Sequence, residues 1–239
     1  KNKKITFVEI GVGDGGSLYM WKSFLHKKSK IIGIDLNPDA KKLEKDGFKI
    51  IIGDQSKKEF WKKFFKKIGK VDIIIDDGGH TNIQQITTLM ESVNFIKDGG
   101  RIIIEDTHTS FMSKKGFNNP SKYSLVSFST SIIENLHRRN PNIKKKLNNF
   151  SKKIFSIEYF DSIVSFKIDE SKCSMTRNLE NNKKLKKNFI DYRFKKDLKK
   201  NKKNSWFNII FEKSFSKRSV VYKIYERVLI SKYYRLLKK

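Results

Sequence analysis

Short apolar runs alternate with helix-like segments through the first 110 residues, and this alternation restricts the fold more than any other feature of the chain. Five runs have the length and composition of buried strands, at residues 5–10, 31–34, 48–52, 71–75 and 101–105. Segments with helical spacing lie between them, at about 18–28, 38–45, 56–65 and 83–96. Alternation of this kind predicts a doubly wound α/β fold with a parallel sheet and right-handed crossovers.

The second half of the chain adds a hairpin and then a basic extension. Residues 153–159 and 162–168 have the pattern of an antiparallel hairpin at the sheet edge, which would complete a mostly parallel, seven-stranded sheet. A helix is expected at 124–139, and the long connection before it, 107–123, is expected to be a lid or a substrate loop. We therefore predict a domain at 1–170 and a Lys- and Asn-rich extension, helical near its end, at 171–239.

The charge is unevenly distributed along the chain. The net charge is +28; residues 1–110 hold 20 Lys and Arg against 15 Asp and Glu, and residues 111–239 hold 33 against 10, so the two parts carry +5 and +23. A solvated surface in a Lys-rich protein explains this charge, and so would attraction to anionic lipid, nucleic acid or a phosphorylated substrate. Charge alone does not choose among these explanations.

The cysteine content and the apolar runs indicate where the protein works. The single cysteine, Cys173, excludes an internal disulfide and fits a reducing compartment. No apolar run reaches the ~18 residues that a membrane-spanning helix needs. We therefore expect a cytoplasmic protein, with association at the inner membrane face as an open possibility. Because the chain begins with Lys1, we also expect that an N-terminal segment precedes it.

A glycine-rich turn follows the first predicted strand. Gly11, Gly13 and Gly16 satisfy G-x-G-x-x-G, and Ser17 is the expected cap of the next helix, as Ser56 is of a later one. Glycines let the backbone turn tightly and let a ligand approach closely. Asp35 ends the second strand, where a carboxylate can accept both hydrogen bonds of a ribose diol. These features fit NAD as well as S-adenosylmethionine.

Three further acidic or amide positions favour S-adenosylmethionine over NAD. Glu9 precedes the first glycine, where a carboxylate can face the ammonium group of a ligand. Asp54 and Gln55 follow the third strand and can hydrogen-bond an adenine edge. A dinucleotide would place its pyrophosphate at the helix N-terminus, where anions are normally favoured. Asp14 lies in that turn, and its negative charge disfavours a bound anion.

Acidic side chains and a histidine follow two other predicted strands. The run VDIIIDDGGH places Asp76, Asp77 and His80 after the fourth strand, and Glu105 and Asp106 follow the fifth. In open α/β sheets the ligand-binding crevice lies outside the carboxyl ends of the strands. The sequence therefore predicts an acidic site, suited to a metal ion, with a base beside it.

Five motifs together resemble a known enzyme family. EIGVGDGGSLYMW, GIDL, GDQ, IDDGGH and IEDTH occur in this order within residues 5–110. They are similar to class I S-adenosylmethionine-dependent methyltransferases, and within these to the metal-dependent sugar O-methyltransferases of the mycinamicin type. The expected contacts to the cofactor are Glu9, Gly11, Gly13, Ser17, Asp35, Leu36, Asp54, Gln55 and Asp76.

The resemblance also implies a metal site and a general base. It assigns a divalent cation, usually Mg²⁺, to Asp77, Glu105 and Asp106, and it assigns proton removal to His80. Magnesium prefers oxygen ligands and keeps positions open for water or substrate. Histidine is the usual base near neutral pH, so His80 and Asp77 are the expected catalytic residues. His108 has no role that the resemblance assigns.

These observations predict an S-adenosylmethionine-dependent O-methyltransferase that acts on a sugar hydroxyl. The expected acceptor is a nucleotide sugar, a bacterial surface glycan or a natural-product sugar, with polysaccharide biosynthesis as one setting. An RNA methyltransferase that uses the basic half is the alternative, and a non-catalytic scaffold on a membrane surface is a third hypothesis. Nucleic acid is the less favoured partner, while an anionic membrane and a second copy of the chain stay open.

Overall fold

The computed structural model describes residues 3–112, 123–140 and 152–175, and seven residues between 220 and 233. The chain divides into two compact units, Lys1–Asn178 and Leu179–Lys239. In the second unit the seven described residues are helical and exposed. Most of the predicted extension lies outside the described residues, and its helical end stays a prediction. The domain boundary predicted after residue 170 stays a prediction.

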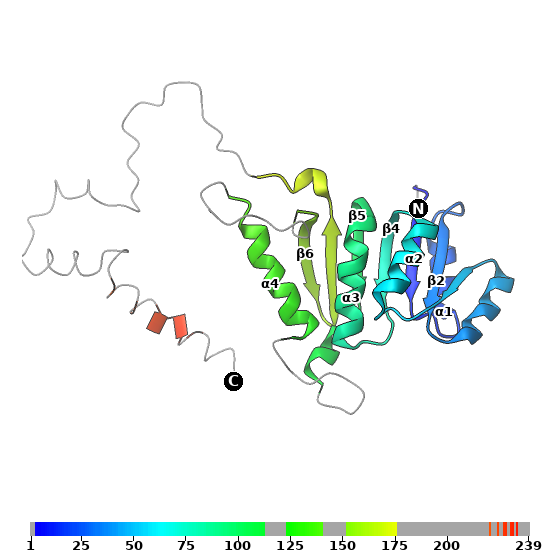
Figure 1. Cartoon of the computed structure of the whole chain (residues 1–239), viewed down its shortest axis with the longest axis horizontal. Helices are drawn as coiled ribbons and strands as arrows, with labels where there is room; N and C mark the ends of the chain where they lie inside the picture. The colour runs from blue at the N-terminus through cyan, green and yellow to red at the C-terminus, as the bar shows by residue number, and fades with distance from the viewer. Residues whose placement is uncertain are drawn as a thin grey trace, which may run out of the picture. The chain divides into compact units, whose positions relative to one another are not determined.

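The first unit is built on one sheet (Figure 1). Its described strands are β1 Thr6–Ile10, β2 Lys30–Asp35, β3 Lys49–Ile52, β4 Val71–Asp76, β5 Ile96–Ile104, β6 Ile154–Phe160 and β7 Ile163–Ile168. Their order in the sheet is β3-β2-β1-β4-β5-β7-β6. The first five strands are parallel, and β7 is antiparallel to both β5 and β6. The predicted seven-stranded α/β fold with an antiparallel hairpin is therefore confirmed.

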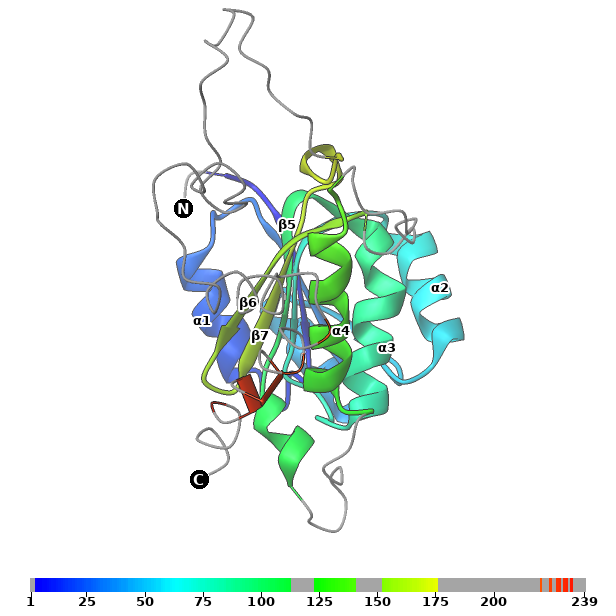
Figure 2. The same ribbon diagram turned by 90° about the vertical axis from the view of Figure 1, so that its left-hand side faces the viewer.

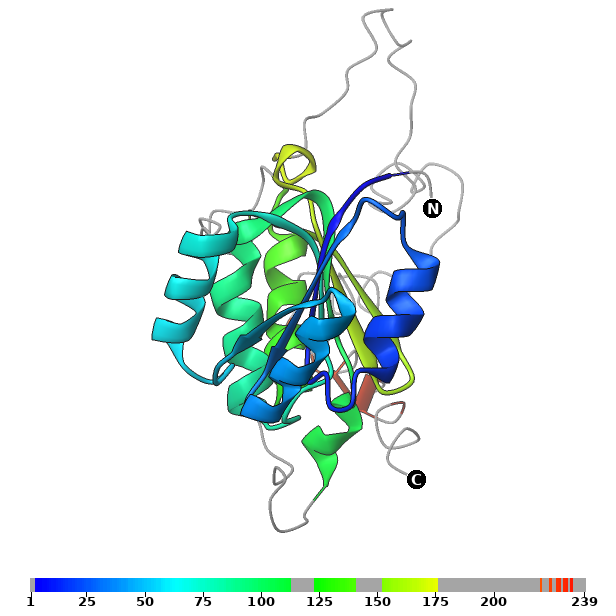
Figure 3. The same cartoon turned by 90° about the vertical axis from the view of Figure 1, so that its right-hand side faces the viewer.

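Helices lie on both faces of this sheet. Figures 2 and 3 show α1 on one face and α2, α3 and α4 side by side on the other. The α-helices are α1 Gly16–Phe24, α2 Lys58–Ile68, α3 Asn82–Ser92 and α4 Leu125–His137, and the 3₁₀ segments are η1 Pro38–Asp46, η2 Val93–Phe95, η3 Thr107–Phe111 and η4 Glu170–Lys172. Within the described ranges, no helix has both the length and the apolar character needed to cross a lipid bilayer.

The main core lies between the sheet and helices α2 to α4. Helix α2 presents Trp61, Phe64 and Phe65 to the strands, and the helical spacing of these residues puts them on one face. Burying each such side chain stabilises the fold by roughly 1.5–3 kcal/mol. A second, smaller cluster packs Leu18 of α1 against Leu43 of η1 on the opposite face. The core thus fixes the parallel strands whose carboxyl ends form one rim.

Two helix caps differ from the prediction. Helix α1 begins after Gly15, not at Ser17, because Gly15 adopts a left-handed φ of 88° and starts the helix earlier. Helix α2 begins after Lys57, not at Ser56, because the Ser56 N–H is engaged by the Asp54 carboxylate at 2.8 Å. This hydrogen bond makes a turn that delays the helix by one residue.

The boundary between α3 and β5 also differs from the prediction. The helix expected to reach residue 96 ends at Ser92, and the strand expected from residue 101 begins at Ile96. Ile96 pairs with Val71 before a register shift in β4. Gly99 has a φ of 83°, and an added Cβ at Gly100 would lie 2.3 Å from the Asp72 carbonyl oxygen. The glycine pair was expected in a loop, but it lies within β5, where it permits the strand to be irregular.

Gly11 allows the loops after β1 and β4 to approach each other. Its φ is 81°, and a Cβ added there would lie 2.1 Å from the backbone oxygen of Asp77. Only glycine combines this backbone conformation with so close a contact. The approach places the glycine-rich loop directly beside the acidic loop.

We expect Gly11→Ala to melt at a lower temperature than the wild-type protein. A left-handed non-glycine residue costs about 1–3 kcal/mol, and the contact with Asp77 adds to this. Since 1 kcal/mol shifts Tm by roughly 2–4 °C in a protein of this size, calorimetry should show a fall of several degrees. The matched control is Gly16→Ala, where an added Cβ meets nothing within 4 Å. Equal melting of both variants would contradict the role of Gly11.

Candidate active site

The candidate site lies where β1, β4 and β5 end side by side. The register pairs Ile10 with Asp76, and Asp76 with Ile104. Beyond these pairs the Asp77 N–H donates to the Ile10 carbonyl at 3.0 Å, and the Glu105 N–H donates to the Asp76 carbonyl at 2.9 Å. Sheet hydrogen bonding thus continues into the loops and fixes where their acidic residues begin.

Asp35 organises the glycine-rich loop through its carboxylate. One oxygen accepts hydrogen bonds from the N–H groups of Val12 at 2.9 Å and Gly13 at 3.1 Å, and the other accepts from the Asn37 N–H at 2.8 Å. Leu36, the next residue, is 66% exposed. The carboxylate therefore lies at the predicted position beside the turn. Contact of Asp35 and Leu36 with a cofactor stays a prediction.

Glu9 is a buried carboxyl group at the end of β1. It is 3% exposed, and its Oε2 makes no hydrogen bond to the described residues. Burial raises the pKa of Glu9 to about 7; the neighbouring Ser17 and Trp21 side chains lower it in part, and the charge of Asp77 raises it. A cationic ligand group would satisfy the oxygen and favour the charged form. The environment of Glu9 therefore fits the predicted ammonium contact.

Gln55 and Asp76 form a buried network beneath the site. The Gln55 Nε2 donates to both Asp76 oxygens at 2.8 and 2.9 Å and to the Thr88 hydroxyl at 3.1 Å. The Gln55 Oε1 accepts from the Gly79 N–H at 3.1 Å. Burial raises the pKa of Asp76, against the effect of the hydrogen bonds from Gln55 and Thr88. Both side chains thus support the loop that leads to His80, and their direct contact with a cofactor stays a prediction.

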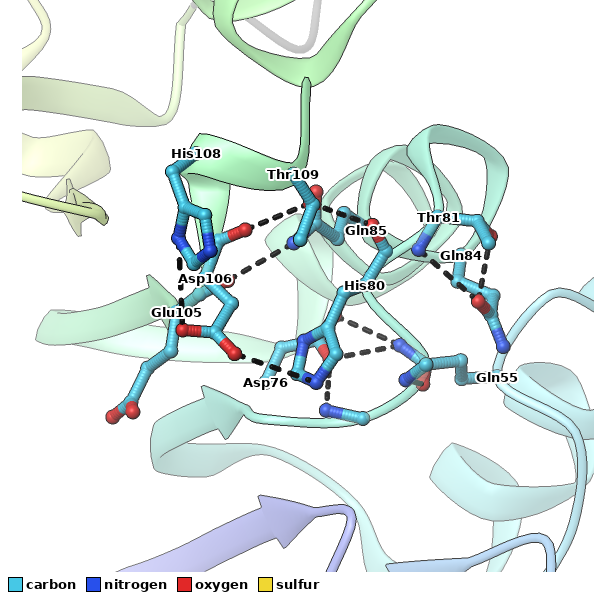
Figure 4. Close-up of polar contacts among 12 residues, drawn as sticks. Gln55, Asp76, His80, Thr81, Gln84, Gln85, Glu105, Asp106, His108 and Thr109 are labelled. Atoms are coloured by element: carbon cyan, nitrogen blue, oxygen red, sulfur yellow. Dashed lines mark hydrogen bonds and ion pairs between the residues drawn. The ribbon is translucent and has the colours of Figure 1, made fainter. Parts of the chain in front are cut away.

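Asp77, His80 and Asp106 lie close enough together for the two carboxylates to hold a metal ion with the imidazole beside it. Each offers a ligand atom, and these atoms lie within 4.8 Å of one another. The His80 Nε2 is 3.6 Å from an Asp106 carboxylate oxygen (Figure 4). Burial raises the pKa of Asp77, and the Asp106 charge also raises it, while His80 lowers it. A cation would relieve this crowding of acids.

Glu105 is near this group but outside it. In Figure 4 its side chain extends away from the His80–Asp106 pair. Its pKa is raised by burial first and then by the charges of Asp77 and Asp106. The structure therefore brings together two of the three predicted metal ligands and the predicted base. The role of Glu105 as a ligand stays a prediction.

The loops of the site hold strained backbone. The described non-glycine residues with left-handed φ are His80 at 57°, Asp106 at 52° and Ser162 at 59°. The Ser162 carbonyl accepts the Thr107 N–H at 3.0 Å, which ties the β6–β7 turn to the loop after β5. Such residues cost roughly 1–3 kcal/mol each and cluster at functional sites. This strain identifies the rim independently of its charges.

Some supporting residues were not predicted from the sequence. Thr81 and Gln84 form a capping box at the start of α3, directly after His80, and T-x-x-Q before an apolar run was the signal for it. The Gln85 side chain donates to the Glu105 carbonyl at 3.0 Å. His108 lies 3.9 Å from Asp106, on the side away from His80 (Figure 4). No sequence pattern identifies these last two contacts.

Known sugar O-methyltransferases match part of this chain in sequence. No protein-family model matches it. Mycinamicin VI 2''-O-methyltransferase of Micromonospora griseorubida is 35% identical over 118 residues, which are 46% of this chain and 29% of that protein. Demethylmacrocin O-methyltransferase of Streptomyces fradiae is 30% identical over 149 residues, 58% of this chain and 37% of that protein.

A solved structure shares the fold. The MycE methyltransferase from the mycinamycin biosynthetic pathway, in complex with Mg and SAH, superposes with a TM-score of 0.63 and 26% identity over 70% of this chain and 46% of that one. Its complex with Mg, SAH and mycinamycin VI gives a TM-score of 0.64 at 24% identity over 70% and 45%. This chain thus spans less than half the length of these relatives. Over the part that aligns, it is similar in sequence and fold to O-methyltransferases, among them the MycE methyltransferase.

Proposed function

We propose that this chain transfers a methyl group from S-adenosylmethionine to a sugar hydroxyl with the help of a divalent cation. The observation that carries the proposal is the group of Asp77, His80 and Asp106, whose ligand atoms lie within 4.8 Å of one another. The rhamnosyl group in the name of a further relative, 8-demethyl-8-alpha-L-rhamnosyl tetracenomycin-C 2'-O-methyltransferase of Streptomyces olivaceus, supports a sugar acceptor. A nucleotide sugar, a surface glycan and a natural-product sugar are all acceptors of this class, and the basic second half would favour one that carries phosphate.

The cofactor would lie over the carboxyl ends of β1, β2 and β3. Its ammonium group would pair with Glu9, whose buried oxygen otherwise lacks a hydrogen bond within the described residues. Gly11 and Gly13 would let the ligand approach the backbone closely. Asp35 would accept hydrogen bonds from the ribose, since a carboxylate oxygen that already accepts an N–H retains further acceptor capacity.

The residues at the rim fit a divalent cation. Oxygen ligands are preferred by Mg²⁺, and Asp77 and Asp106 supply carboxylate oxygens in one place. We assign Glu105 as the third ligand, because it directly precedes Asp106 and its N–H donates to the carbonyl of Asp76, the residue before Asp77, at 2.9 Å. When bound, the cation would supply positive charge that lowers the pKa of a hydroxyl group beside it.

His80 would remove the proton from the acceptor hydroxyl. As the acceptor oxygen forms its bond to the methyl carbon, the bond from that carbon to sulfur breaks, and the sulfonium becomes a neutral thioether. The proton passes to Nε2 of His80, which lies 3.6 Å from the Asp106 carboxylate. That carboxylate would stabilise the imidazolium. Alignment of oxygen, carbon and sulfur supplies much of the acceleration, and no covalent enzyme intermediate is needed.

We expect both metal removal and His80→Ala to suppress methyl transfer. An acceptor is first identified by offering nucleotide sugars and glycan fragments with S-adenosylmethionine and MgCl₂, and by detecting the mass of one added methylene. Loss of a general base should then lower kcat by roughly 10²–10⁴-fold. His137→Ala, an exposed residue at the end of α4, is the control and should retain full activity. Methyl transfer that survives both EDTA and His80→Ala unchanged would rule out this mechanism.

We expect the affinity for S-adenosylmethionine to rise between pH 6 and 7.5 in the wild-type protein. Glu9 has a pKa of about 7, so it gains the charge that pairs with an ammonium group over this range. Calorimetric titration should give a flat profile for Glu9→Gln, with affinity at pH 7.5 reduced by roughly ten- to a hundredfold, since charged hydrogen bonds contribute about 1.5–3 kcal/mol.

Although Glu9→Gln should weaken ligand binding, it should stabilise the unliganded protein above neutral pH. The pKa of Glu9 is about 7 in the folded protein and has its ordinary value of 4.5 in the unfolded chain, so the folded state binds the extra proton between these pH values. Stability therefore falls as pH rises through this window. Glu9→Gln should have a higher Tm than the wild type at pH 8, and the two Tm values should be equal near pH 4.5.

For the binding experiment, a wild-type affinity for S-adenosylmethionine that does not change with pH would argue against the ammonium contact.

A further inference from the structure

Thr109 joins the two loops of the candidate site. It belongs to η3, and its side chain is 2% exposed. Its hydroxyl oxygen lies 2.9 Å from the His80 carbonyl oxygen and 2.8 Å from the Asp106 carbonyl oxygen (Figure 4). One residue thus contacts the backbone of the proposed base, after β4, and of a proposed metal ligand, after β5.

We propose that Thr109 is a positioning residue that sets the distance between the His80 imidazole and the Asp106 carboxylate. The inference rests on the proposed function, because it assigns a purpose to that distance. Thr109 would not touch the cofactor or the acceptor. It acts through the backbone of the two residues that do the chemistry.

The backbone of both residues needs such support. His80 and Asp106 have φ values of 57° and 52°, a conformation that persists in non-glycine residues only where the surroundings enforce it. On its N-terminal side the His80 loop is anchored by the bond from the Gly79 N–H to Gln55. This contact fixes the His80 loop to the loop after β3. The Thr109 hydroxyl adds the link from one loop to the other.

The hydroxyl is the part of the side chain that makes this link. A threonine hydroxyl carries one hydrogen, so the two carbonyl oxygens share it. Asp106 retains a second bond, since its carbonyl also accepts the Thr109 N–H at 3.1 Å. Loss of the hydroxyl should therefore break the link to His80 and leave the Asp106 carbonyl with the bond from the Thr109 N–H. Valine has nearly the same shape and lacks the hydroxyl, while serine keeps it.

The test compares Thr109→Val, Thr109→Ser and the control Ser110→Ala in the full chain. Ser110 is 0% exposed, lies in the same 3₁₀ segment, and its hydroxyl makes no hydrogen bond to the described residues. Mn²⁺ binding is measured by electron paramagnetic resonance, with no acceptor present. Loss of a group that orients metal ligands typically weakens metal binding by 10–100-fold. We expect a weakening in this range for Thr109→Val, about wild-type affinity for Ser110→Ala, and substantial rescue in Thr109→Ser.

A second readout makes failure of this inference distinguishable from failure of the proposed function. The backbone amide signals of His80 and Asp106 are followed by NMR without metal, and Thr109→Val should move the His80 signal well beyond the change caused by Ser110→Ala. Thr109→Val that binds Mn²⁺ as the wild type does, with His80 unmoved, would overturn the inference alone. A wild-type protein that binds no Mn²⁺ would overturn the metal-assisted function, and the amide signals would still decide whether Thr109 positions His80.

Discussion

The hydrogen bonds between Gln55 and Asp76 are the constraint on which the site depends. Asp76 is 1% exposed, and a carboxylate buried without partners would be strongly destabilising. Gln55 supplies two hydrogen bonds to it and uses its remaining oxygen to hold the Gly79 N–H. Because Gln55 follows β3, Asp76 ends β4 and Thr88 lies on α3, this network joins the core to the loop that carries His80. The core and the loop that carries the proposed base are therefore held by the same hydrogen bonds.

The site is acidic within a strongly basic protein. The chain carries a net charge of +28, yet no described Lys or Arg forms an ion pair with Glu9, Asp77 or Glu105. Burial raises the pKa of each of these three acids. These three acids thus lack a described Lys or Arg partner, although the protein contains many such residues. Such a rim is suited to ligands that bring positive charge, as a sulfonium amino acid and a divalent cation do.

The sequence was sufficient to locate the rim but not to orient its side chains. Apolar runs predict parallel strands, and parallel strands bring their carboxyl ends together, so Asp77 and Asp106 could be expected as neighbours. Gln55 could not be recognised as buried, because it lies beyond the last paired residue of β3, where alternation in the pleat gives no sign. Asp76 could not be recognised because a carboxylate at the end of a strand is normally exposed. Thr109 carried no signal at all, since its contact with His80 depends on a left-handed turn in each loop. Gly99 and Gly100 led to a wrong start for β5, because a glycine pair is found at a bulge within a strand as readily as in a loop.

Charge couples the two proposed ligands. The Asp77 charge is one of the causes that raise the pKa of Glu9. A cation held by Asp77 would offset that charge, and Glu9 would then ionise more readily and bind an ammonium group more tightly. By linkage, the bound cofactor would favour the cation to the same degree. The crowded acids and the left-handed residues, which weaken the unliganded fold, thus lie where the two proposed ligands would relieve them together.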